Sequence, residues 1–149
     1  MNKKVFLLIL FLLLAGSAMA TNPLSRTGYV GNIGCAATPQ LGFGVDVTTS
    51  HGYSFGNGLW VGAGAGVSIA SAFDGVFLPL FAETKYSFFS DERVSPFVDC
   101  RIGYMTNFDS LYVLFSPMAG IDINKLSLFA TNSIWGGVRT LSFGVALNF

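Results

Sequence analysis

Charged residues are scarce in this sequence. Only 11% of its 149 residues are Asp, Glu, Lys or Arg, eight acidic and eight basic, while 52% are hydrophobic. An ordinary soluble domain has a surface rich in Lys and Glu, so this composition argues against one. The sequence also has no basic patch, and we therefore expect no nucleic-acid partner.

Residues that commonly bind metals are equally rare. His51 is the only histidine, and the two cysteines, Cys35 and Cys100, form no Cys-x-x-Cys motif. The sequence therefore predicts no metal site and no cofactor. The two cysteines fall in strands that we predict to lie far apart, so we expect two unpaired, small apolar residues and no disulfide.

Helix signals are nearly absent, and no linker, fixed repeat or low-complexity segment divides the chain. Apolar residues instead alternate with small or polar ones between short turns, which is the pattern of β-strands. A Gly-Asn-Gly tight turn at 56–58 is one such break. We predict eight strands, over residues 28–37, 40–55, 59–70, 76–89, 94–105, 111–123, 126–132 and 140–149.

The first 20 residues differ from the rest of the chain. Two lysines precede an unbroken apolar run over residues 5–15, and Ala18 and Ala20 form a small-x-small cleavage site. This order predicts a cleaved secretory signal peptide over residues 1–20. An uncleaved anchor is the alternative, but the run is short for a helix that needs about 20 residues to span a membrane. Cleavage leaves one domain, residues 21–149, which contains six basic and eight acidic residues.

The two faces of the predicted strands have different compositions. In strand 76–89 one face is apolar, while the other carries Phe77, Phe81, Glu83 and Lys85. A soluble barrel or sandwich would turn the apolar face inward, whereas a transmembrane barrel turns it toward lipid and fills its lumen with polar and small residues. The mixed face is mostly Gly, Ser, Ala and Phe, so we favour the transmembrane barrel over a soluble all-β fold. A helical membrane protein is the third alternative, and glycine at every second position of 62–66 speaks against it.

Two further features support this fold. Aromatic residues gather near strand ends, as expected for girdles at the two membrane interfaces; they are Tyr53, Phe55, Tyr86, Phe88 and Tyr104. An even number of strands lets the last strand pair with the first, which removes every exposed sheet edge. The sequence thus predicts an all-β fold, an eight-stranded antiparallel up-and-down transmembrane β-barrel.

The final strand alternates up to the last residue of the sequence. Its pattern Ser142-x-Gly144-x-x-Leu147-x-Phe149 resembles the C-terminal assembly signal of Gram-negative outer-membrane barrels. Together with the signal peptide and the eight strands, residues 21–149 resemble small barrels of the OmpX and OmpA-transmembrane-domain type. The resemblance implies a bacterial outer-membrane location, contact with outer-membrane lipid, and recognition by the barrel-assembly machinery. We expect a monomer with both termini and the turns at 56–58, 90–93 and 124–125 in the periplasm, and with the segments near 37–39, 71–75, 106–110 and 133–139 outside.

Six charged residues fall on the predicted lumen face: Asp46, Glu83, Lys85, Asp99, Arg101 and Asp122. A buried unpaired charge costs several kcal/mol, so we predict an internal ion network that stiffens the barrel. A gate or a proton path is the alternative. Pairing across the turn at 90–93 should set Lys85 opposite Asp99, Glu83 opposite Arg101 and Phe81 opposite Gly103.

Three functions are consistent with such a barrel. They are a non-enzymatic structural or interaction role, a lipid-modifying enzyme, and a minor small-solute channel. Ser50 and His51 are adjacent but point to opposite faces, and no catalytic triad falls in the predicted outer loops, so we expect no enzyme. Eight strands leave room only for side chains in the lumen, which disfavours a channel. The sequence therefore favours the non-enzymatic role.

Overall fold

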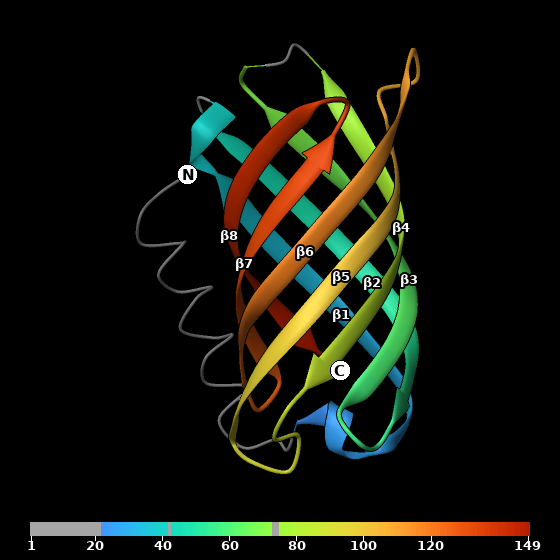
Figure 1. Ribbon diagram of the computed structural model, residues 1–149, viewed down its shortest axis with the longest axis vertical. Helices are drawn as coiled ribbons and strands as arrows, with labels where there is room; N and C mark the ends of the chain where they lie inside the picture. The colour runs from blue at the N-terminus through green and yellow to red at the C-terminus, as the bar shows by residue number, and fades with distance from the viewer. Residues whose placement is uncertain (1–21, 42, 73–74) are drawn as a thin grey trace.

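The chain forms a closed, eight-stranded barrel in the computed structural model, which describes residues 22–41, 43–72 and 75–149 (Figure 1). The strands are β1 (Thr27–Thr38), β2 (Gly44–Phe55), β3 (Leu59–Ala70), β4 (Val76–Ser87), β5 (Val94–Thr106), β6 (Leu111–Ile123), β7 (Leu126–Trp135) and β8 (Val138–Asn148). Two short 3-10 helices, η1 (Pro23–Ser25) and η2 (Pro39–Leu41), complete the described elements. Every strand pairs antiparallel with the next, and β8 pairs with β1. The predicted up-and-down barrel is confirmed.

Some predicted features lie elsewhere or outside the described residues. The cleavage site at Ala18 and Ala20 falls outside them. The second strand begins at Gly44 and not at residue 40, because residues 39–41 form the 3-10 turn η2, whose first residue is a proline. No helix in the described part of the chain is both long enough and apolar enough to cross a membrane.

The hairpin between β7 and β8 corrects the predicted loop at 133–139. Both strands extend into that segment, and only Gly136 and Gly137 separate them. Their φ angles are +54° and +81°, and two positive φ angles are what a two-residue type I′ hairpin requires. The run of polar residues before Ile134 hides the alternation in the sequence, which is why this segment resembles a loop.

The predicted register between β4 and β5 is confirmed. Glu83 lies opposite Arg101, Lys85 opposite Asp99, and Phe81 opposite Gly103. Ring closure is equally regular, since β1 and β8 pair from Asn32 opposite Asn148 to Ala37 opposite Phe143. The backbone of Phe149 extends this pairing by one residue, donating to and accepting from Gly31 at 2.8 and 2.9 Å.

Side chains alternate between the outside and the lumen as the sequence predicts. In β5, Val98, Ile102 and Tyr104 are exposed, whereas Phe97 and Asp99 are buried. The predicted girdle residues all point outward and are exposed: Tyr53, Phe55, Tyr86, Phe88 and Tyr104. The apolar face is thus the outer surface, and the mixed face lines the lumen.

The connections divide between the two ends of the barrel. Those joining β1 to β2, β3 to β4, β5 to β6 and β7 to β8 lie at the top of Figure 1, the upper end. The turns between β2 and β3, β4 and β5, and β6 and β7 lie at the lower end with η1 and the last residue of β8. This grouping of turns agrees with the predicted topology.

Candidate functional site

The lumen is the candidate functional site, and an apolar plug closes its lower end. The plug consists of Leu24, Val30 and Trp60, of which Leu24 and Trp60 are each 2% exposed. The short helix η1 carries Leu24 beneath the barrel, where the Ser54 hydroxyl donates to the Leu24 carbonyl. The Trp60 indole donates to the Val30 carbonyl at 3.1 Å. The plug was not predicted from the sequence, because no pattern linked residues 22–26 to the barrel.

Above the plug lies the first of two ion pairs. Lys85 Nζ is 2.7 Å from Asp122 Oδ1, and both side chains are almost fully buried. Asp122 also accepts hydrogen bonds from the hydroxyls of Ser87 at 2.6 Å and Ser127 at 2.5 Å. The ammonium group of Lys85 further lies 3.9 Å from the centre of the Phe97 ring. In a buried ion pair with several further hydrogen-bond donors, these interactions offset much of the free-energy cost of removing the charges from water.

The second ion pair joins β4 and β5. Arg101 donates to Glu83 Oε1 through Nε at 3.0 Å and Nη2 at 2.9 Å. The Ser50 hydroxyl donates to the other oxygen of Glu83, and the guanidinium lies 4.6 Å from the centre of the Phe81 ring. Glu83 is 2% exposed, so this pair is also shielded from water.

The predicted partner of Lys85 is corrected. Lys85 faces Asp99 across the strands, as expected, but its ammonium group reaches Asp122 on β6. A lysine side chain is long enough to cross a narrow lumen, and Asp122 already sits among hydroxyl donors. Among the described residues the charges therefore form two separate pairs, and neither Asp46 nor Asp99 joins an ion pair within 4.0 Å.

Asp99 lines a small cavity between the two pairs. It is 7% exposed, and its Oδ1 has no hydrogen-bond partner within the described residues. The side-chain oxygen of Asn32, on the same cavity, also lacks one. All six predicted charges thus face the lumen, but two of the four carboxylates lack a basic partner.

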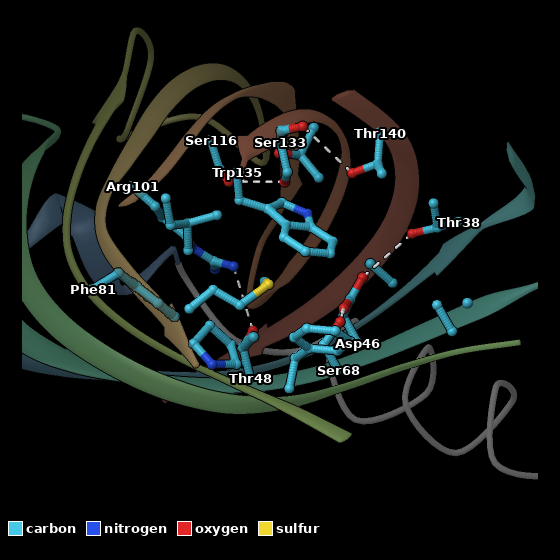
Figure 2. Close-up of a pocket in the computed structure, with 18 of the residues that line it drawn as sticks. Thr38, Asp46, Thr48, Ser68, Phe81, Arg101, Ser116, Ser133, Trp135 and Thr140 are labelled. Atoms are coloured by element: carbon cyan, nitrogen blue, oxygen red, sulfur yellow. Dashed lines mark hydrogen bonds between the residues drawn. The ribbon is translucent and has the colours of Figure 1, made fainter. Parts of the chain in front are cut away.

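A larger hollow lies in the upper lumen (Figure 2). Its non-atom space is about 770 Å³, counting the part open to solvent, and the space in it that water-sized molecules can occupy corresponds to about four or five waters. On one side of it the upper cluster packs together: Phe77, Phe81, Met105, Leu114 and Trp135. On the other side β1, β2, β3 and β8 contribute small or polar residues, including Asp46. The hollow exists because the bulky lumenal side chains at this level come from β4 to β7.

Ser50 and His51 do not form a catalytic pair. Ser50 is buried in the lumen on Glu83, while His51 lies on the outer face, where its ring nitrogens bond Tyr29 and Thr49. Among the described residues no group of three or more His, Cys, Asp or Glu side chains could hold a metal ion. Cys35 and Cys100 are free thiols, and both belong to the outer face of their strands.

The residues of the predicted assembly signal occupy both faces of β8. Ser142 lies in the lumen, 2.5 Å from the Thr38 hydroxyl, and Gly144 leaves room for the ring of Phe129. Leu147 and Phe149 are on the outer face. The Phe149 ring lies over Gly31, where a Cβ atom would come within 2.6 Å of it, and beside His51.

Comparisons with known proteins show the fold. No protein-family profile and no curated protein sequence matches the chain. The N-terminal β-barrel domain of Pseudomonas aeruginosa OprF is similar with a TM-score of 0.53 and 14% identity, over 83% of this chain and 100% of that one. A structure described as "De novo design of transmembrane beta-barrels" is similar with a TM-score of 0.54 and 17% identity, over 88% and 100%. At these identities the likeness establishes a small barrel and not a shared function.

Proposed function

We propose that this chain is a non-enzymatic, integral β-barrel protein of the bacterial outer membrane with a structural or interaction role. One observation carries the proposal: the barrel is apolar outside and polar inside. Among the described residues, twenty polar or charged side chains are buried, against fourteen hydrophobic ones. In water, an outer surface of this kind would exceed the apolar patches that soluble proteins tolerate. In a bilayer the same surface is solvated by lipid.

The distribution of charge on the outer surface supports the same proposal. The charged residues of the strands all face the lumen except Arg139, the second residue of β8. The remaining described charges lie in the turns and ends: Arg26, Asp91, Glu92, Arg93, Asp109 and Lys125. Strands of 10 to 13 residues match the roughly 9–11 residues that a tilted transmembrane strand needs.

The lumen favours a structural role over the two alternatives. Both of its basic side chains are engaged in ion pairs, and the lower plug blocks the passage of solutes. A lipid-modifying enzyme would need a nucleophile and a base together, which Ser50 and His51 cannot supply from opposite faces. On this proposal the chain is a monomer that contacts outer-membrane lipid, and the barrel-assembly machinery reads the signal ending at Phe149.

Expression of the full chain in a Gram-negative host tests the proposal. We expect the protein in the outer-membrane fraction, with the intact mass of a chain that begins at Thr21. Its gel mobility should change on boiling, because a closed barrel resists detergent when unheated. A chain found free in the periplasm, or a membrane-bound chain that retains residues 1–20, would contradict it.

A further inference from the structure

The described part of the lumen holds more acidic than basic side chains, and the acidic side chains without an ion-pair partner lie in different cavities. Two basic side chains, Lys85 and Arg101, pair with Asp122 and Glu83. Among the described residues two carboxylates are left without an ion-pair partner, Asp99 in the small cavity and Asp46 in the upper hollow. We infer that the upper hollow binds a small primary alkylammonium ion, with Asp46 as the anchoring carboxylate. This inference goes beyond the proposed structural role.

Asp46 has the geometry of an anchor. The Ser68 hydroxyl donates to its Oδ1, and the Thr38 hydroxyl donates to its Oδ2 at 3.4 Å. Each carboxylate oxygen can accept more than one hydrogen bond, so acceptor capacity is left on the side of the hollow (Figure 2). Asp46 and Ser68 are both partly exposed, which means that a solute entering from the upper end can reach them.

The apolar cluster beside this carboxylate suits the apolar part of such a ligand, since Phe77 lies opposite Ser68 across the strands and Ser68 lies opposite Asp46. Phe77 and Trp135 pack with their ring centres 5.1 Å apart and line the hollow together with Met105. Aromatic faces attract ammonium ions and also pack against methylene groups. The ligand must be small, because the hollow has room for only about four or five non-hydrogen atoms at water-sized spacing.

The floor of the hollow selects against anions. Arg101 forms part of it, but two of its donors are engaged by Glu83. An anion would therefore meet a neutralised guanidinium and the negative charge of Asp46. Asp99 is a poorer anchor, since its cavity is smaller and is also lined by Lys85, whose positive charge opposes a cationic ligand.

An NMR titration tests the inference on the mature chain refolded in maltoside micelles, which carry no ammonium headgroup. The probe is n-propylammonium chloride, and n-propanol is its neutral counterpart of similar size. The chain has two tryptophans, so the Trp135 indole reports on the hollow and the Trp60 indole on the lower plug. We expect saturable shifts at Trp135 in the millimolar range, as the few atoms of the probe allow, with no shift at Trp60.

Two carboxylate variants complete the test. Asp46→Asn should weaken binding roughly ten- to hundred-fold, the worth of a hydrogen bond to a charged group. Asp109→Asn removes the same charge from a loop at the same end and should bind like the wild type. The inference is overturned by equal responses to n-propanol and n-propylammonium, by the absence of saturation, or by wild-type affinity in Asp46→Asn. If Asp46→Asn does not fold, as its Trp60 signal would reveal, the comparison of amine with alcohol on the wild type decides alone.

Discussion

At the scale of single residues, two lumenal carboxylates of similar burial have opposite environments. Asp122 accepts hydrogen bonds from Lys85, Ser87 and Ser127. Asp99, one strand away, keeps an oxygen without a hydrogen-bond partner among the described residues. The energetic consequences of removing each charge should therefore differ in sign.

We predict that Asp122→Asn lowers the free energy of unfolding by about 3–5 kcal/mol, because it leaves the Lys85 ammonium buried without its counter-charge. Asp99→Asn is the matched variant and should leave stability unchanged or raise it, since it removes a carboxylate without an ion-pair partner. Urea titration of the barrel in lipid vesicles, followed by tryptophan fluorescence, measures both. Equal losses in the two variants would show that Asp99 shares the charge of Lys85 with Asp122, which would contradict the assigned pairing.

The sequence was sufficient to predict which charged residues face the lumen and that Glu83 pairs with Arg101, but not the partner of Lys85. Alternation along each strand places all six charges inside, and opposite charges across one turn fix the register of β4 and β5. The reach of Lys85 to Asp122 depends on a flexible side chain crossing the barrel, which no strand pattern encodes. The hollow beside Asp46 likewise depends on side-chain sizes contributed by several strands at one level.

At the scale of elements, the β7–β8 hairpin depends on its two glycines. Gly136 and Gly137 both have positive φ angles, but their surroundings differ. A Cβ atom at Gly136 would come within 2.8 Å of the Tyr112 ring, whereas one at Gly137 would meet nothing within 4 Å. A side chain would therefore strain the backbone at both positions, but it would clash with a neighbouring ring only at Gly136.

We predict that Gly137→Ala destabilises the barrel by about 1–2 kcal/mol, which is the penalty of a left-handed conformation for a residue with a Cβ atom. Gly136→Ala should be more harmful, because the Tyr112 ring must also move. Gly137→Asn is the control and should lie closest to the wild type, since asparagine tolerates this conformation. The urea midpoints of the three variants rank them, and a Gly136→Ala variant as stable as Gly137→Ala would contradict the assigned contact.

The ends of elements were the least predictable part of the fold. A proline at residue 39 and a glycine pair at 136–137 both mark turns in the sequence. The second strand was predicted to begin directly after this proline, at residue 40, and the glycine pair was placed in a longer loop, because polar residues next to each hid where the alternation starts or stops. The helix η1 was not predicted, because its burial depends on contact with Trp60, which lies 36 positions after Leu24.

At the scale of the whole molecule, the lumen is blocked below and hollow above. The lower plug, the two ion pairs and the buried ring of Phe97 occupy successive parts of it. We therefore predict no stable pore when the purified protein is added to planar lipid bilayers at neutral pH. Reproducible large single-channel steps would show that this filling is displaced in the membrane.

The central claim is that the apolar outer face of the barrel is in contact with lipid, and the native thiols test it most directly. Cys35 is exposed on that face, so a barrel in water would leave it open to reagents, and only a bilayer can shield it. We expect that a charged, membrane-impermeant maleimide adds to neither cysteine of the folded protein in lipid vesicles, but to both after unfolding in urea, as read by intact mass. Modification of Cys35 in the folded, vesicle-bound protein at the rate of a free thiol in water would contradict the account.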